Sequence, residues 1–251
     1  MAYINPNPEI KDYKEIINTQ ESDYKEINEV YFAFIDVLGF KKTFDDIKVN
    51  KFVTAEKYRD VFNYYFELMN SSKLMDREKN TGCYAGQTSD TLYFYTSRTD
   101  YLLQFIKIFS HFSLYAMTQN VFFRGGIAKG SLFKKEDYQF FGDSVIGAYL
   151  LESNISKNPI ITVDEKTYND IKKENDCEKF IKNDEGRHYI KPFALLYEDV
   201  VLDIIDGFRR RDFDAKQIED NIKNNMSIFE YDANNYQKYS FLKKIYDAGN
   251  K

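Results

Sequence analysis

The sequence contains few of the residues that build zinc sites, disulfide frameworks or membrane spans. Its two histidines, His111 and His188, are too far apart to suggest a zinc site. Its two cysteines, Cys83 and Cys177, form no metal-type or redox-type pair, which favours a reducing, cytoplasmic location. No apolar stretch approaches the length of about 18 residues that a transmembrane helix needs. Residues 1–20 are polar and mixed in charge, which is not typical of a secretory signal.

Excess positive charge is also absent. With 35 basic and 40 acidic residues, the net charge is −5, which argues against nucleic acid as the main ligand. A small nucleotide remains compatible because it needs only a local basic patch. The length of 251 residues and the hydrophobic content of 43% are sufficient for one soluble domain with a sizeable core.

The hydrophobic pattern of the first half predicts a mixed α+β domain. Apolar, β-branched and aromatic runs predict strands, and apolar residues three and four apart predict helices. The expected order is a strand at 29–36, a helix over 41–70, strands at 82–88 and 91–96, a helix over 100–117 and a strand at 121–129. This β-α-β-β-α-β order is the ferredoxin-like arrangement.

The second half continues with shorter elements and ends in helices. We expect a charged turn at 133–138, a strand at 139–141, a helix over 143–152, a strand at 159–163, a helix from 164 and a late strand at 188–196. The simplest division is an N-terminal arm or helix at 1–28, a catalytic domain at 29–198, and a helical C-terminal extension at 199–251 packed on the same domain.

Asp36 is the most informative residue, because it ends an apolar strand and opens a turn that contains a glycine. The Asp36 carboxylate could bind a metal ion, with the backbone carbonyl of Val37 as a further ligand. The amides of Leu38, Gly39 and Phe40 could hold phosphates at the start of the following helix. An aspartate that merely caps this helix is an equally good interpretation of the motif alone.

A second carboxylate, Asp90, occupies the expected tip between the strands at 82–88 and 91–96. A Ser-Asp pair is ordinary hairpin-turn chemistry, and for this motif alone that interpretation is favoured. Two carboxylates on adjacent strands beside a glycine turn would nevertheless suit a divalent metal that holds a triphosphate.

Three glycines interrupt the strand within residues 123–130. Glycine normally weakens a strand, so its use here suggests close contact with a ligand or a partner backbone. The flanking Arg124 and Lys129 could neutralise phosphate. A bulged strand with solvated ends explains the segment equally well.

Small residues also mark the expected helix within residues 141–153. Gly147 and Ala148 would let this helix pack closely, and a core helix is the more economical interpretation of this segment alone.

Taken together, these four motifs, in order over residues 31–168, resemble those of the class III nucleotide cyclases. The resemblance implies a palm core built on the ferredoxin-like arrangement. It also implies two Mg²⁺ or Mn²⁺ ions per site, held by Asp36 and Asp90, and a homodimer with its sites at the subunit interface. Metal ligands would come from one subunit and base contacts from the other.

The departures from that family point to a different base. The positions that read purines in the family fall on Gly86 and Gln139, and the transition-state asparagine and arginine fall on Ile146 and Leu150. Because both metal carboxylates remain, a change of substrate is favoured over loss of activity. The pattern resembles the pyrimidine cyclases of bacterial Pycsar anti-phage defence. That resemblance implies conversion of UTP or CTP to a 3′,5′-cyclic mononucleotide that activates a separate effector.

A smaller base needs a smaller pocket, so bulky side chains should fill the space of a purine. Phe34 shares the strand face of Asp36 by the period of two, and Tyr84 and Phe141 are further candidates for this filling. Gln139 could hydrogen-bond the edge of the base. Three basic residues could replace the missing transition-state arginine: Arg124, Lys129 and Lys191.

Three alternatives remain open at this point. The first is a purine cyclase with unusual base contacts. The second is a catalytically silent module that binds a nucleotide or only dimerises. The third is a palm-type oligonucleotide or cyclic-dinucleotide synthase, which the segment 142–153 disfavours.

Overall fold

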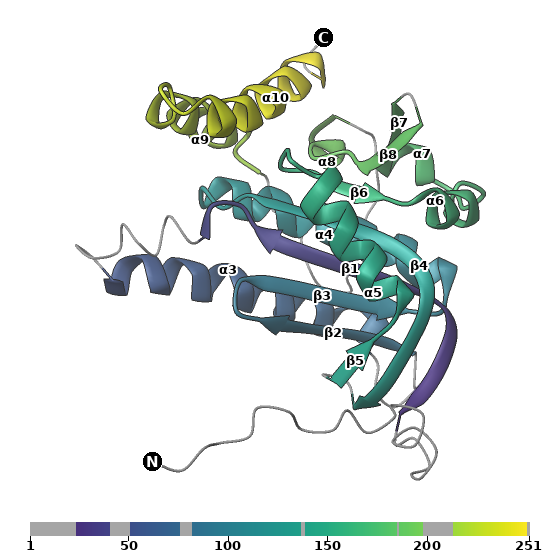
Figure 1. The fold of residues 1–251 in the computed structure, drawn as a ribbon. Helices are drawn as coiled ribbons and strands as arrows, with labels where there is room; N and C mark the ends of the chain where they lie inside the picture. Colours follow the sequence, from purple (N-terminus) through teal and green to yellow (C-terminus); the bar gives the residue numbers. More distant parts are fainter. Residues whose placement is uncertain are drawn as a thin grey trace, which may run out of the picture.

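A computed structural model describes residues 24–40, 51–75, 82–136, 139–184, 186–197 and 213–249 (Figure 1). One sheet in the order β2-β3-β1-β4-β6-β8-β7, with β5 paired to β4, forms its centre. The strands are β1 (Lys25–Val37), β2 (Cys83–Thr88), β3 (Thr91–Thr96), β4 (Phe123–Glu136), β5 (Gln139–Phe141), β6 (Ile161–Val163), β7 (Ile181–Asp184) and β8 (Arg187–Ile190).

Helices flank this sheet and follow it in the chain. The α-helices are α3 (Lys51–Ser71), α4 (Thr99–Thr118), α5 (Asp143–Leu150), α6 (Glu165–Ile171), α7 (Cys177–Phe180), α8 (Ala194–Tyr197), α9 (Ala215–Ile228) and α10 (Ala233–Gly249). A 3₁₀ turn, η1 (Lys73–Met75), follows α3, and a π-helical turn, η2 (Leu151–Ile155), continues directly from α5.

The strand pairing confirms the predicted α+β, ferredoxin-like core. β3 lies between β1 and β2 and is antiparallel to both, and β4 is antiparallel to β1 on the other side. Strands β1 and β2 are therefore parallel to one another with a strand inserted between them, which is the split βαβ arrangement. Beyond this core, β4 pairs with β6 in parallel.

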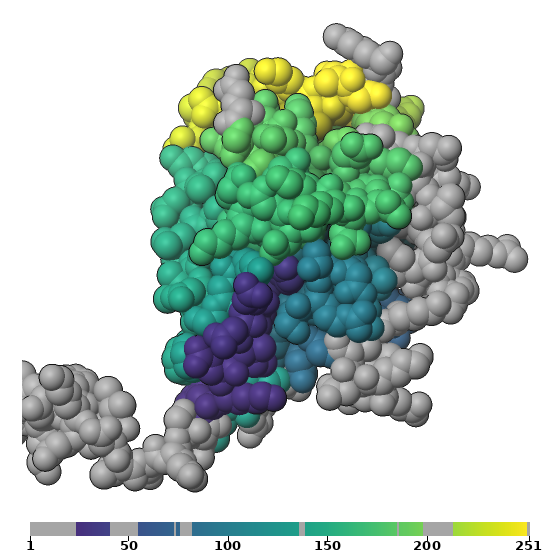
Figure 2. Space-filling view, turned by 90° about the vertical axis from the view of Figure 1, so that its right-hand side faces the viewer, coloured from purple at the N-terminus to yellow at the C-terminus, as the bar shows by residue number. Residues whose placement is uncertain are grey.

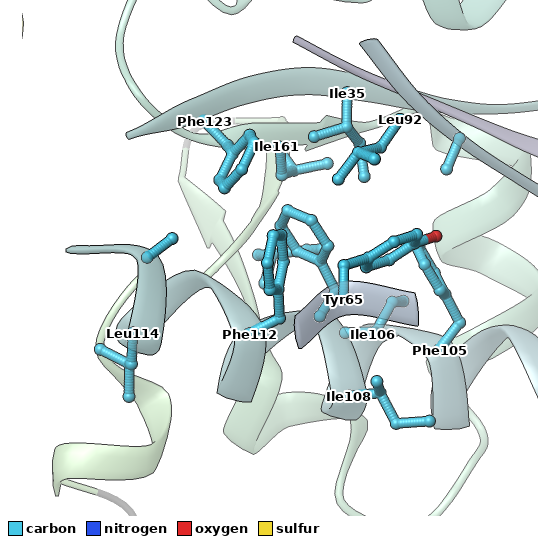
Figure 3. Packing of buried hydrophobic residues seen from close by; sticks show 14 of the residues in the cluster. Ile35, Tyr65, Leu92, Phe105, Ile106, Ile108, Phe112, Leu114, Phe123 and Ile161 are labelled. Atoms are coloured by element: carbon cyan, nitrogen blue, oxygen red, sulfur yellow. The ribbon is translucent and has the colours of Figure 1, made fainter. Parts of the chain in front are cut away.

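One face of the sheet holds the main core. Alternate residues of β1, such as Ala33 and Ile35, point toward α3 and α4 and are at most 1% exposed. The predicted apolar stripe of α4 packs there, with Phe105 and Phe112 fully buried below Ile35 (Figure 3). Removing such side chains from water stabilises the fold by about 1.5–3 kcal/mol each, so this layer fixes the position of β1.

The other face of the sheet carries α5, which crosses β1 and β4 (Figure 1). Glycines in β4 allow this close approach. A methyl group added to Gly126 would lie 2.3 Å from the carbonyl oxygen of Ala148 in α5, and one added to Gly130 would lie 2.7 Å from the amide nitrogen of Ser144. Gly125 lies equally close to the backbone of β1. The sequence suggested that these β4 glycines contact a ligand or a partner backbone. In the structure they instead make room for the backbone of α5 and β1 in the same chain.

Several predicted boundaries are wrong, and strand pairing explains them. β1 begins at Lys25, so residues 25–28 belong to the sheet and not to an N-terminal helix. β4 continues to Glu136 through the predicted turn at 133–138, because the first residues of β1 and the short β5 supply hydrogen-bond partners for its backbone. The predicted strand at 188–196 ends at Ile190 and pairs with β7, which the pattern did not reveal. The predictions for residues 1–23 and 41–50 lie outside the described residues.

The two C-terminal helices pack on the core at the end of the sheet where β1 terminates. The Asn221 side chain in α9 donates to the carbonyls of Met117 and Thr118, at 2.8 and 3.0 Å, and so satisfies the last turn of α4. Figure 2 shows α10, in yellow, at the opposite end of the molecule from the first residues of β1, in purple. The proposed boundary at 198/199 lies outside the described residues and stays a prediction.

Within the part of the chain that the structure describes, no helix combines the length and the apolar character needed to cross a membrane.

Candidate functional site

The end of β1 brings Asp36 between two neighbouring strands. In the sheet register, Asp36 lies opposite Arg124 of β4 on one side and Thr91 of β3 on the other. Asp90 is the last residue of the turn before β3, and its carbonyl accepts a hydrogen bond of 3.3 Å from the amide of Val37. Ser89 supports the turn with a φ of 56°. The two predicted metal carboxylates therefore do meet at one edge of the sheet.

The charges around Asp36 are unbalanced. Burial and then repulsion by the Asp90 carboxylate raise the pKa of Asp36 to about 6, against partial relief from Arg124. One guanidinium nitrogen of Arg124, Nη2, lies 3.4 Å from Asp36 and 2.7 Å from Glu152. Asp36 and Glu152 thus share one arginine side chain while Asp90 repels Asp36, so the site favours the arrival of further positive charge.

Glu152 is a member of this cluster that the sequence did not suggest. It lies in the turn η2, its side chain is only 5% exposed, and burial raises its pKa, with Arg124 acting in the opposite direction. The sequence does contain a signal, because Glu152 is the only charged residue within 144–152. A lone carboxylate at the end of an apolar helical segment needs a partner when it is buried.

The donor set fits a divalent hard cation. Magnesium sites commonly use one or two carboxylates and complete their coordination with water and substrate phosphates. Asp36 and Asp90 provide such a pair, and a divalent cation would offset the burial and the repulsion by Asp90 that raise the pKa of Asp36. No cluster of three or more histidine, cysteine or acidic residues suited to a metal occurs among the described residues. The proposed carbonyl ligand of Val37 stays a prediction.

The turn after β1 only partly matches the predicted phosphate-binding role. The Leu38 amide donates to the carbonyl of Phe122 at 2.8 Å, so it is engaged within the chain and not presented to a phosphate. Gly39 has a φ of +78°, which explains glycine at this position. The ring of Phe40 packs against Tyr58 with centroids 5.1 Å apart. The first ten residues of the helix expected over 41–70 lie outside the described residues, and the remainder is confirmed as α3.

Aromatic rings cover the sheet beside the carboxylates. Gly86, Tyr93, Phe34 and Gly126 form one row across β2, β3, β1 and β4 on the face of Asp36. A methyl group on Gly86 would lie 2.2 Å from the ring of Tyr93, so this ring occupies the space that a side chain at position 86 would use. Phe34 meets Tyr149 edge-on at 5.7 Å. Tyr93 was not predicted as a site residue.

Lys129 and Lys191 are not brought to the carboxylate pair. Lys129 is five residues along β4 from Arg124, so its side chain emerges on the opposite face, where its Nζ lies 2.8 Å from Asp170 and 3.2 Å from Glu29. Lys191 follows β8 and lines a pocket on the α4 side of the sheet. Of the three basic candidates, only Arg124 contacts Asp36.

Gln139 and Phe141 lie at the far end of β4. Phe141 pairs with Phe133, nine residues and roughly 30 Å of strand away from Arg124. Gln139 is exposed, and Phe141 is 53% exposed and packs against Phe133 and Tyr24. Within one chain these residues do not approach Asp36.

The outer surface of α5 and η2 is apolar and exposed. Its members are between 42% and 57% exposed, and we call them the α5 ridge: Ile146, Tyr149, Leu150 and Ile155. Two of them, Ile146 and Leu150, occupy the positions that align with the transition-state asparagine and arginine in the motif comparison described above. Neither side chain can donate a hydrogen bond.

Comparisons with known proteins add a set of distant structural likenesses. No protein-family model matches the chain, and no curated protein matches it. The guanylyl cyclase domain of the RhoGC fusion protein from the aquatic fungus Blastocladiella emersonii is 19% identical, with a TM-score of 0.45, over 66% of this chain and 95% of that one. The guanylate cyclase domain of RhGC from Catenaria anguillulae, in complex with GTP, is 18% identical, with a TM-score of 0.43, over 66% of this chain and 97% of that one.

A bacterial structure gives a similar result. The adenylate/guanylate cyclase/hydrolase from Silicibacter pomeroyi is 15% identical, with a TM-score of 0.42, over 66% of this chain and 95% of that one.

Proposed function

We propose that this chain is a nucleotide cyclase that converts UTP or CTP to the 3′,5′-cyclic mononucleotide and pyrophosphate. The observation that carries the proposal is the meeting of Asp36 and Asp90 at one sheet edge beside Arg124. Two carboxylates with a deficit of positive charge suit a cation-bound triphosphate better than a purely structural role.

The proposed reaction is an intramolecular phosphoryl transfer. The ribose 3′-hydroxyl attacks the α-phosphate, a new P–O bond forms, the bond to pyrophosphate breaks and the hydroxyl proton is lost to solvent. Two Mg²⁺ or Mn²⁺ ions bound at the carboxylates would supply Lewis acidity at the attacking and leaving oxygens. Asp36 and Asp90 would hold these ions and so orient the triphosphate, and Arg124 would offset negative charge beside it.

The choice of a pyrimidine rests on the aromatic row. Gly86 offers no side chain to read a base, and the Tyr93 ring covers that position. Phe34 and Tyr149 add bulk on the same face, so the space beside the carboxylates favours a small base. Base contacts from Gln139 and Phe141 would have to come from a second chain.

The direct test is to incubate the purified protein with ATP, GTP, CTP and UTP separately, with Mn²⁺, and to identify products by mass spectrometry. A cyclic UMP or cyclic CMP product supports the proposal. A cyclic purine product would retain the metal site and reject the base assignment. A dinucleotide product would favour a synthase, and no product from any of the four would favour a silent module.

Replacing Tyr93 with alanine should open the space over Gly86 and shift the enzyme toward purines. We expect the ratio of purine to pyrimidine turnover to rise by roughly tenfold or more, the usual scale for a change of pocket volume. The measurement is product formation from an equimolar mixture of the four triphosphates. Tyr101→Ala, a tyrosine on α4 at the other face of the sheet, is the control. An unchanged ratio in Tyr93→Ala would remove Tyr93 from the specificity argument.

We further propose a two-fold symmetric homodimer formed through the α5 ridge. The ridge is apolar and exposed, and a second chain is the occupant that would bring Gln139 and Phe141 toward the carboxylates of the first. The site is incomplete without that second copy.

A charge in the α5 ridge should therefore dissociate the dimer. We expect Leu150→Glu to sediment as a monomer and to lose most turnover, because desolvating an unpaired carboxylate opposes association. Analytical ultracentrifugation measures the mass directly. Ile228→Glu is the matched control, since Ile228 is 69% exposed on α9, away from the ridge. A dimeric Leu150→Glu protein would place the interface elsewhere.

For the cellular role, we propose that the cyclic nucleotide is a second messenger that activates a separate effector in antiviral defence. Only the resemblance of the motifs to pyrimidine cyclases supports this role. Phage plaque counts on bacteria that carry the gene with its neighbouring genes, compared with an Asp36→Asn strain, test it. Equal counts in both strains would reject it.

A further inference from the structure

The C-terminal helix α10 is docked beside the carboxylate site. Tyr239 is 6% exposed and packs against Phe122 with ring centroids 5.1 Å apart. Phe122 immediately precedes β4, and its carbonyl accepts the Leu38 amide. The same strand places Arg124 two residues further on. A helix fixed on Phe122 therefore lies at the edge of the site.

This docking brings a second cation toward Arg124. Lys238 immediately precedes Tyr239, and its partly buried ammonium donates to Asn235 Oδ1 at 2.9 Å. Burial, and then repulsion by Arg124, lowers the pKa of Lys238, against partial relief from Asp232. Within the described residues no carboxylate lies within ion-pair distance of Lys238. Arg124 is already paired with Asp36 and Glu152. Divalent cations that arrive with a polyphosphate would offset these carboxylates, and the like charges of Lys238 and Arg124 would then favour the phosphate groups.

Arg124 itself has spare hydrogen-bonding capacity. Its Nη2 atom serves Asp36 and Glu152, whereas its Nε atom is buried and has no hydrogen-bond partner among the described residues. An unpaired buried donor costs free energy unless a ligand satisfies it. The phosphate oxygens of a polyphosphate are strong acceptors for both a guanidinium and an ammonium group.

We propose that Lys238 and Arg124 together bind the terminal phosphates of the substrate, so that α10 is part of the substrate site. The inference rests on the proposed function for its substrate class, a nucleoside triphosphate. It assigns the C-terminal helices a role in substrate binding in addition to packing. Lys238 is a binding residue here, and it acts beside the metal carboxylates because its partner Arg124 contacts Asp36.

The test uses the full chain and inorganic tripolyphosphate with Mg²⁺, measured by isothermal titration calorimetry. We expect Lys238→Gln to weaken tripolyphosphate binding about tenfold or more, the scale of a charge-assisted hydrogen bond to phosphate. Lys238→Arg should keep most of the affinity because it keeps the charge. Lys244→Gln, an exposed lysine on the same helix, is the matched control and should bind as the wild type.

Kinetics provide a second readout if the chain has cyclase activity. Lys238→Gln should then raise the KM for the nucleotide by about tenfold with a smaller change in kcat, since the contact is made to bound substrate as well as in the transition state. Unaltered tripolyphosphate affinity in Lys238→Gln, or no binding by the wild type, overturns the inference. Failure of the cyclase proposal is distinct, because it shows as the absence of cyclic product from every triphosphate.

Discussion

Replacing Asp36 with asparagine should lower cyclic nucleotide formation by on the order of 1000-fold, because a metal carboxylate contributes several kcal/mol of charge stabilisation. The asparagine amide has nearly the same shape as the carboxylate but no charge. It therefore cannot bind a divalent cation together with Asp90. Residual turnover should not recover at high nucleotide concentration, since the loss is in the chemical step. Mass-spectrometric product formation with Mn²⁺ over a range of nucleotide concentrations measures this.

The control for Asp36→Asn is the same change at Asp60, whose side chain is 59% exposed on α3 and pairs with its neighbour Arg59. Asp60→Asn should keep wild-type activity. Full activity in Asp36→Asn would contradict the metal assignment, whatever the identity of the base.

The same change should stabilise the protein when no metal is present. The pKa of Asp36 is raised to about 6, so ionising its carboxyl group costs folding free energy. Ionisation of Asp36 therefore subtracts from the stability of the wild type as the pH rises from about 4 to 6, and Asp36→Asn lacks this contribution. Thermal unfolding at pH 7 without metal should give a higher Tm for Asp36→Asn. Adding Mn²⁺ should raise the Tm of the wild type alone, which is a readout independent of turnover.

Replacing Gly126 with alanine should destabilise the fold strongly. Among substitutions that add one methyl group on the α5 face of the sheet, we expect this one to lower the free energy of unfolding most. The added carbon would lie 2.3 Å from the carbonyl oxygen of Ala148 and 2.5 Å from Cβ of Leu151. Because the first of these contacts is backbone, α5 must move away from β4. Overpacking of this kind costs about 1–3 kcal/mol, which for a domain of this size lowers Tm by roughly 3–10 °C.

The displacement should also reach the site, because α5 continues into η2 and carries Glu152. We expect Gly126→Ala to weaken the contact of Glu152 with Arg124 and to reduce turnover. The control is Gly186→Ala in the turn between β7 and β8. An added methyl group there has no atom within 4 Å, but the φ of +81° strains any residue other than glycine. That strain is about 1–2 kcal/mol, so activity should be unchanged there. Equal activity in the two variants would show that α5 can shift without consequence for Arg124.

The sequence predicted the core of the fold because its signals there are local. The α4 stripe follows the helical period, and the strands on either side of Asp90 follow the period of two, so both elements matched the structure closely. Asp36 at a strand end and Asp90 at a hairpin tip were likewise visible, since each is fixed by a strand and its adjoining turn. The β-α-β-β order then allows few pairings, and the sheet followed.

The tertiary structure decided which other residues join the two carboxylates, because those contacts depend on elements far apart in the chain. Arg124 meets Asp36 through strand register, whereas Lys129 in the same motif points to the opposite face. Glu152 arrives on η2 and Lys238 on α10, and no local pattern marks either as a partner of Arg124. The glycines of β4 illustrate the same division: the sequence suggested either a close approach or a bulged strand, and only the packing identified α5 and β1 as what approaches.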